Sequence, residues 1–294
     1  MSTTLAEHVA ALESQGYTVL DGMLTPAEID EARTELDALF RRESRVGALH
    51  GWHNDTYRVA YMLPQKHPLF RRLLRNDRLL SFVRAALGPT CILSSMNGFT
   101  TTPGGAQQSL HIDQQESVPG TLLTINTLHV LDDFTRDNGC TRLVPGTHNR
   151  RWTGSPADVE SAEHDAIYIE APAGSLVAYS GGLWHASSRN RTTRERRVLH
   201  AYFARDWVQP EWDFPGSLTG DVVESLTEDE RRLMGFCTKT SRYDSRLDRA
   251  APAEPGRGGD RSPSRRLTRR GGLLDWHVWA KRLTRSRAAI RSAR

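Results

Sequence analysis

The spacing of apolar residues predicts that the first third of the chain is mainly helical. Apolar side chains recur at helical spacing over residues 5–12, Gly16 ends that segment, and Tyr17–Leu20 reads as a short strand. Thr25-Pro26-Ala27-Glu28 has the pattern of a capping box with proline at the first helical position. A further amphipathic stretch runs over about 69–87. We therefore expect helices over about 1–90.

From residue 91 the pattern changes to short apolar runs of strand type, separated by turn residues. Pro103-Gly104-Gly105, Asp137-Asn138-Gly139 and Pro145-Gly146 are typical turn sequences. Many short strands with regular turns indicate a β-sandwich or barrel. The predicted strands are Cys91–Thr100, Gln108–Asp113, Leu122–Leu131, Thr141–Val144, Ile167–Glu170, Ser175–Ser180 and Arg196–Phe203, and a last helix is predicted over Thr227–Met234.

Composition favours one large globular domain over about 1–240, with its β core over about 91–205. Of the 294 residues, 38% are hydrophobic, which is enough for a packed core. No apolar run reaches the roughly 18–20 residues that span a bilayer, and the N-terminus lacks the apolar region of a secretory signal. The 3 cysteines are far apart and predict no disulfide framework, so a reducing cytoplasm is expected.

The positive charge is concentrated at the C-terminus. Residues 251–294 carry 12 Lys or Arg against 3 Asp or Glu, so the rest of a chain of net charge +4 is mildly acidic, which argues against nucleic-acid binding. Residues 241–272 are rich in Arg, Pro, Gly and Ser and predict a disordered linker. Residues 273–294 predict a basic amphipathic helix, for which contact with an anionic membrane is the less favoured alternative to docking or disorder. The oligomeric state is left open.

The sequence Leu110-His111-Ile112-Asp113 suggests a metal site. On a strand, His111 and Asp113 point to the same face, so they could provide two ligands of a facial triad that leaves other metal positions open. The pattern is not sufficient by itself, because His53-Asn54-Asp55 repeats it between helical segments. A strand-end hydrogen-bonded pair is the alternative interpretation of His111 and Asp113.

Two further residues strengthen the metal hypothesis. His185 follows the predicted strand Ser175–Ser180 and is well placed to face the same interior. Arg196 opens the next strand, where its planar guanidinium could bind a carboxylate. The alternatives are a surface histidine and a solvated arginine cluster.

With these motifs in order, the chain resembles the phytanoyl-CoA dioxygenase family of Fe(II)/2-oxoglutarate oxygenases. The resemblance covers roughly residues 5–236. It rests on the blocks SQGYTVLDGMLTPAEIDEAR, GGAQQSLHIDQQ, LDDFTRDNGCTRLVPGTH and APAGSLVAYSGGLWHASSRNRTTRERR.

The resemblance implies a double-stranded β-helix (jelly-roll, cupin-like) core, and iron held by His111, Asp113 and His185. It implies that Arg196 binds the distal carboxylate of 2-oxoglutarate, although a one-residue shift would give this role to Arg197. His148 is expected to be a structural or pocket-wall residue and not a ligand. The weaker candidates for the co-substrate site are Ser187, Gln108, Thr124 and Asn126.

The implied reaction consumes O2 and 2-oxoglutarate, releases succinate and CO2, and oxidises a small organic substrate, with bacterial secondary metabolism as the expected setting. Related halogenases have a small residue where this chain has Asp113, so hydroxylation, desaturation or another oxidation is expected instead of halogenation. The alternatives are a cupin-like metal enzyme that does not use 2-oxoglutarate and a non-catalytic binding module. The residues expected to line the substrate site are His50, Trp52, His53, Tyr57, Tyr61, Met96, Trp207 and Trp212.

Overall fold

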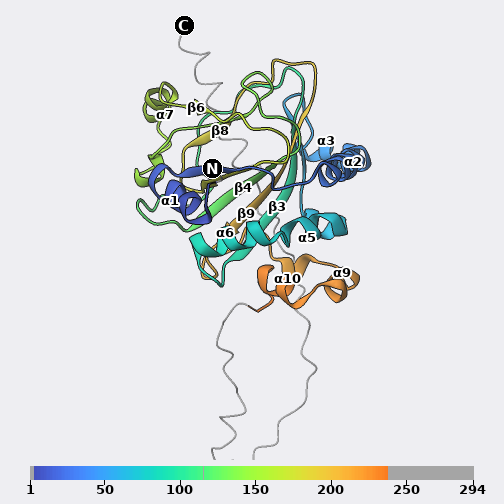
Figure 1. The fold of residues 1–294 in the computed structure, drawn as a ribbon. Helices are drawn as coiled ribbons and strands as arrows, with labels where there is room; N and C mark the ends of the chain where they lie inside the picture. The colour runs from blue at the N-terminus through green and yellow to red at the C-terminus, as the bar shows by residue number, and fades with distance from the viewer. Residues whose placement is uncertain (1–2, 115, 238–294) are drawn as a thin grey trace, which may run out of the picture. The chain divides into compact units, whose positions relative to one another are not determined.

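Two antiparallel sheets form the centre of the fold in the computed structural model, which describes residues 3–114 and 116–237 (Figure 1). Within that part of the chain, the larger sheet has six strands in the order β1-β7-β4-β9-β3-β2, and the smaller has three in the order β6-β5-β8. The strands are β1 (Tyr17–Leu20), β2 (Tyr57–Ala60), β3 (Ile92–Thr101), β4 (Thr124–Val130), β5 (Thr141–Leu143), β6 (Ile167–Tyr168), β7 (Leu176–Ser180), β8 (His185–Ser187) and β9 (Arg196–Ala204).

Helices flank the larger sheet, which confirms the prediction of a mainly β fold with helices outside. The predicted capping box at Thr25 and Glu28 is present at the start of α2, where each side chain accepts a hydrogen bond from the backbone of the other residue. The helices are α1 (Leu5–Gln15), α2 (Pro26–Arg42), α3 (Ser44–His50), α4 (Leu63–Lys66), α5 (Pro68–Leu74), α6 (Asp77–Leu87), α7 (Pro156–Glu163), α8 (Phe214–Ser217), α9 (Gly220–Ser225) and α10 (Glu228–Leu233), with a 3-10 turn η1 (Thr147–Asn149).

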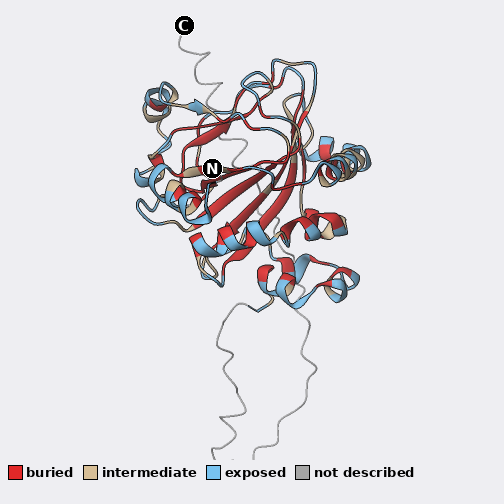
Figure 2. Cartoon of the chain, in the orientation of Figure 1, coloured by how far each residue is buried: buried red, intermediate tan, exposed pale blue. Residues whose placement is uncertain are grey.

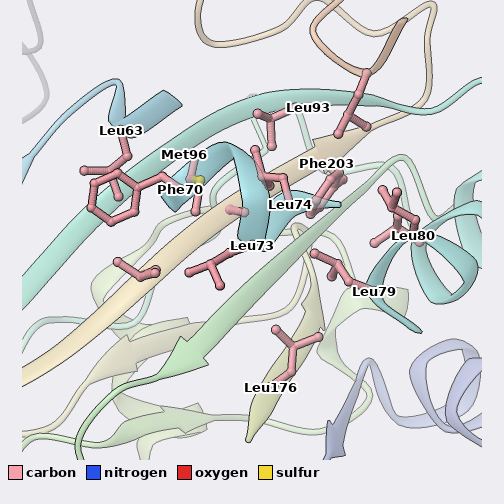
Figure 3. Packing of buried hydrophobic residues seen from close by; sticks show 14 of the residues in the cluster. Leu63, Phe70, Leu73, Leu74, Leu79, Leu80, Leu93, Met96, Leu176 and Phe203 are labelled. Atoms are coloured by element: carbon pink, nitrogen blue, oxygen red, sulfur yellow. The ribbon is translucent and has the colours of Figure 1, made fainter. Parts of the chain in front are cut away.

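The larger sheet has an apolar core on each face, and its central strands are buried (Figure 2). On one face, Phe70 of α5 belongs to the same cluster as Phe203 of β9 (Figure 3). Leu36 of α2 belongs to this cluster too. On the other face, Val198 of β9 clusters with Leu143 of the smaller sheet. Alternate residues of a strand therefore face either the helices or the space between the two sheets, which we call the helix face and the inner face.

Two predicted elements differ from the structure. The amphipathic stretch over 69–87 is two helices, α5 and α6, because the Asn76 side chain accepts hydrogen bonds from the N–H groups of Arg78 and Leu79 and starts a new helix. The segment Gln108–Asp113 is not a regular strand. It forms a single bridge between His111 and His185, since the N–H groups of residues 113 and 114 both donate to one carbonyl, that of Gly181.

The chain divides into the units Met1–Thr240 and Ser241–Arg294. The linker predicted over 241–272 and the basic helix predicted over 273–294 lie outside the described residues and stay predictions. Among the helices that the structure describes, none combines the length and the apolar character needed to cross a membrane.

Candidate metal centre

The three predicted metal ligands come together from two neighbouring segments. His111 and His185 exchange backbone hydrogen bonds, with each N–H donating to the other's carbonyl over 3.0 Å. The Asp113 N–H donates to the Gly181 carbonyl over 3.0 Å, so the second segment also fixes the backbone of Asp113. One nitrogen or oxygen atom of each side chain lies within 4.8 Å of the others, and no second such group of His, Cys, Asp or Glu occurs in residues 3–114 and 116–237. Backbone hydrogen bonds between the two segments therefore bring the three side chains to a metal-binding spacing.

Both histidines are oriented through their second ring nitrogen. Nδ1 of His111 lies 3.0 Å from the Ser109 carbonyl, and Nδ1 of His185 lies 2.9 Å from the Leu183 carbonyl. A carbonyl can only accept, so Nδ1 carries the proton in each ring and Nε2 is left as the basic atom. Nε2 of His111 and His185 lies 3.7 and 3.3 Å from an Asp113 oxygen. This donor set, two imidazoles and one carboxylate, fits a divalent transition metal such as Fe(II).

The charges at the centre are strongly coupled. Burial acts to raise the pKa of Asp113, but the facing His185 lowers it well below its usual range. Burial acts to lower the pKa of His185, and the Asp113 carboxylate outweighs it and raises that pKa. Burial, together with the neighbouring His185, lowers the pKa of His111 to about 4. Asp113 is therefore a carboxylate at neutral pH, and His111 is neutral, as metal binding requires.

The second His-x-Asp sequence is not a ligand pair. Nε2 of His53 lies 3.3 Å from the Val59 carbonyl, and its ring packs edge-on against Phe40 with centroids 5.7 Å apart. His148 is also outside the centre, with Nε2 at 3.0 Å from the Glu13 carbonyl.

Arg196 and Arg197 lie on opposite faces of β9. Arg196 is 3% exposed on the inner face, with its guanidinium 4.5 Å from the centre of the Phe134 ring and one Nη2–H donating to the Gly139 carbonyl. Its Nε has no hydrogen-bond partner, and it has no carboxylate within ion-pair distance among the described residues. Arg197 instead pairs with Asp37 at 2.7 Å and Asp132 at 3.0 Å.

The weaker co-substrate candidates divide into two pairs. Gln108 is exposed, and its Oε1 accepts a hydrogen bond from the Ser187 N–H over 2.9 Å, so the two residues brace the segment before His111. Thr124 and Asn126 are buried on the inner face of β4. Thr124 donates to Gln114 over 3.2 Å, whereas Asn126 has an Nδ2 with no hydrogen-bond partner.

Several inner-face residues were missed by the sequence reasoning. The ring of Tyr179 packs on His185 with centroids 4.5 Å apart, and Nε2 of His200 lies 2.5 Å from Oδ1 of Asn126. Tyr202 follows on the same face, and its hydroxyl interacts with Thr124. The sequence contains a signal for His200 and Tyr202: alternate residues of a strand face the same side, so residues 198, 200 and 202 lie on the same face as Arg196.

The predicted substrate-site residues are only partly brought together. An aromatic row links the rings of His50, Trp52, Tyr61 and Trp212, with successive centroids 4.9, 5.0 and 5.7 Å apart. Met96 was wrongly assigned, because it lies in the helix-face cluster (Figure 3). Trp207 is 69% exposed and makes no ring contact in the described part of the chain.

Comparisons with known proteins find a matching family and several relatives of this chain. The model of the family described as Phytanoyl-CoA dioxygenase (PhyH) matches residues 12–198. The Mycobacterium tuberculosis protein Rv1501 is 27% identical over 254 residues, which cover 81% of this chain and 89% of that protein. The "Fe(II)/2-oxoglutarate-dependent dioxygenase nvfF" of Aspergillus novofumigatus is 25% identical and is matched over 77% of this chain and 80% of its own length.

Among solved structures, HygX of Streptomyces hygroscopicus has a similar fold, with a TM-score of 0.57 and 20% sequence identity. The match covers 70% of this chain and 89% of HygX, whose crystal structure holds nickel, 2-oxoglutarate and hygromycin B.

Proposed function

Because the chain belongs to the phytanoyl-CoA dioxygenase family, we propose that it oxidises a C–H bond of a small organic molecule at an iron held by His111, Asp113 and His185. Family membership confirms the predicted resemblance, and with it a dioxygenase that depends on Fe(II) and 2-oxoglutarate. We assign the two facing antiparallel sheets to the double-stranded β-helix core that the resemblance implies.

The observation that carries the role of 2-oxoglutarate is the buried guanidinium of Arg196. A buried charge costs free energy unless it is paired, and no carboxylate among the described residues pairs with this one. Burial lowers the pKa of Arg196 to about 10, so the group is still charged at neutral pH. Its position near Tyr179, which packs on His185, supports binding of the distal carboxylate of 2-oxoglutarate when the other end lies at the metal.

The remaining residues of the site hold the metal ligands in position. Bound Fe(II) and 2-oxoglutarate supply the oxidising chemistry, and the protein supplies position and exclusion of water. The Ser109 and Leu183 carbonyls hold the imidazole rings, and the Gly181 carbonyl holds the Asp113 segment. Because Asp113 provides a carboxylate where related halogenases have a small residue, hydroxylation or desaturation is proposed instead of halogenation.

The substrate is proposed to be a small molecule of bacterial secondary metabolism. HygX holds hygromycin B together with 2-oxoglutarate, which supports an organic small molecule as the partner of this fold.

An anaerobic titration tests the reaction class. Metal-free protein receives Fe(II) and then 2-oxoglutarate while the visible charge-transfer band of the chelate is recorded. The band is expected in the unaltered protein and in His148→Ala, and it is expected to be absent in His185→Ala. Iron binding without a band would reject 2-oxoglutarate and favour the cupin-like alternative. No iron binding would favour a binding module.

A further inference from the structure

Arg142 is a fully buried arginine that the proposed function does not use. It is the middle residue of β5 and is 1% exposed. Its neighbour Leu143 packs in the inner-face cluster, so Arg142 points to the opposite side of the smaller sheet, which we call the outer side. Ala186 of β8, its register partner, belongs to an apolar cluster on that side together with Leu110 and Ile112. Arg142 is therefore buried behind the segment that carries two of the metal ligands.

The guanidinium of Arg142 connects two segments that are separate in the sequence. Nη2 donates to the Gln108 carbonyl over 2.5 Å, and Nη1 forms an ion pair with Glu163, the last residue of α7. His185 of β8 pairs with β5 on one edge and bridges to His111 on the other. Since β8 lies between β5 and the metal-binding segment, Arg142 reaches across β8 to hold that segment.

The Gln108 carbonyl belongs to the peptide unit just before the one that orients His111. The Ser109 carbonyl lies 3.0 Å from Nδ1 of His111 and fixes its ring. Because a peptide unit is planar, holding the Gln108 carbonyl also fixes the N–H of Ser109 and limits where the Ser109 carbonyl can point. The segment 108–113 forms a single bridge instead of a regular ladder, so this side-chain bond supplements few backbone bonds.

Burying Arg142 costs free energy that its ion pair only partly offsets. Its Nε is buried and makes no hydrogen bond, and buried ion pairs add little net stability because desolvation opposes the attraction. An apolar side chain would match Val144 and Trp184 in the cluster on the outer side, but it would not donate to the Gln108 carbonyl. The position that Arg142 fixes therefore explains it better than stability does.

We propose that Arg142 is a positioning residue for the metal centre. Held by Glu163, it fixes the Gln108 carbonyl and through it the ring of His111. This inference rests on the proposed function, because it takes His111 as a metal ligand, and it adds a residue outside the ligand set. It also makes α7 a support of the metal centre.

The test measures binding of Co(II) to the metal-free protein, because the visible absorption of Co(II) reports both affinity and ligand geometry. Arg142→Met should raise the Kd for Co(II) about tenfold and shift the absorption, since loss of groups that orient metal ligands typically lowers metal affinity about 10- to 100-fold. Arg142→Lys keeps the charge and should recover part of the affinity. Glu163→Gln should raise the Kd less than Arg142→Met does. Glu160→Gln, at an exposed position of α7, is the matched control and should change neither quantity.

A second control separates positioning from a general loss of stability. Val83→Ala removes part of a buried side chain of α6 in the helix-face cluster, so it should lower the free energy of unfolding without changing the Kd for Co(II). An unchanged Kd and absorption in Arg142→Met, or an equal rise of the Kd in Val83→Ala, would overturn the inference. If Arg142→Met does not fold, Glu163→Gln decides in its place, and an unchanged Kd there has the same consequence.

Failure of the proposed function gives a different result. If the unaltered protein binds no Co(II), or if His185→Ala binds it as tightly as the unaltered protein, the metal centre is rejected and this inference with it. If His185→Ala loses binding while Arg142→Met keeps it unchanged, only the role of Arg142 is rejected.

Discussion

The adjacent residues Arg196 and Arg197 lie on opposite faces of β9 and have opposite ion-pair environments. On the helix face, Arg197 donates to Asp37 through two nitrogens at 2.7 and 3.0 Å and also pairs with Asp132. On the inner face, Arg196 is more deeply buried and has no carboxylate partner in the described part of the chain. A cation whose partners are built into the fold stabilises the fold, whereas a buried cation without one is available to an anionic ligand.

Histidines occur on both faces of the larger sheet, so they do not separate the two faces as the two arginines do. His200 lies on the inner face, beside Asn126. His129 lies on the helix face of β4, is 1% exposed, and has an Nδ1 without a hydrogen-bond partner. An unsatisfied buried group is therefore not by itself a functional signal. What separates Arg196 from His129 is its position on the face turned toward the smaller sheet, whose strand β8 begins with the metal ligand His185.

Removing an inner-face metal ligand should have the largest effect. His185→Ala is expected to lose iron and to reduce turnover of 2-oxoglutarate at least about 1000-fold, because the metal contributes several kcal/mol to the reaction. Metal analysis and succinate formation measure the two effects. His148→Ala is the matched control and should retain both; if it also lost iron, the assignment of ligands would be wrong.

Arg196→Ala should raise the Kd for 2-oxoglutarate about 10- to 100-fold, because hydrogen bonds to a charged group contribute about 1.5–3 kcal/mol. Iron binding should be unchanged. Arg196→Lys should recover part of the affinity, since it keeps the charge but not the two-pronged geometry. Titration of the chelate band gives the Kd for 2-oxoglutarate in the unaltered protein and in both variants. An unaltered Kd in Arg196→Ala would exclude this residue as the carboxylate partner.

Arg197→Ala should act on stability alone. We expect the free energy of unfolding to fall by about 1–3 kcal/mol, since the ion pairs with Asp37 and Asp132 are half-buried. Urea denaturation measures the change, and Arg191→Ala, which removes an exposed pair, should change it by less than about 1 kcal/mol. An increased Kd for 2-oxoglutarate with unchanged stability would reverse the roles of the two arginines.

The last effect appears only in acid and concerns the stability contributed through His129. Burial lowers the pKa of His129 to about 4, so from about pH 6.5 down to 4 the unfolded chain binds a proton that the folded chain does not. The free energy of unfolding therefore falls with pH in this window, by at most about 1.4 kcal/mol per pH unit from this residue. His129→Gln should show a shallower dependence in urea denaturation at several pH values. If the free energy of unfolding fell equally with pH in both proteins, His129 would not be the cause of the pH dependence.

Local patterns were sufficient for much of the fold. The capping box at Thr25, the end of α1 at Gly16 and the positions of β3, β4, β7 and β9 follow from hydrogen-bonding capacity and apolar alternation within a few residues. The segment Gln108–Asp113 was predicted as a strand because it alternates. Its partner is a short segment around His185, and that pairing, distant in sequence, allows one bridge only.

The sequence by itself determined which residues have the chemistry for the site: the histidines and carboxylate at strand spacing, and arginines next to one another on a strand. Only the tertiary structure decided that His53 packs against Phe40 and that Arg197 pairs with aspartates. Side-chain alternation is a property of the backbone and can be read locally. Which face is the inner one, and which charges have partners there, depends on contacts between segments far apart in the chain.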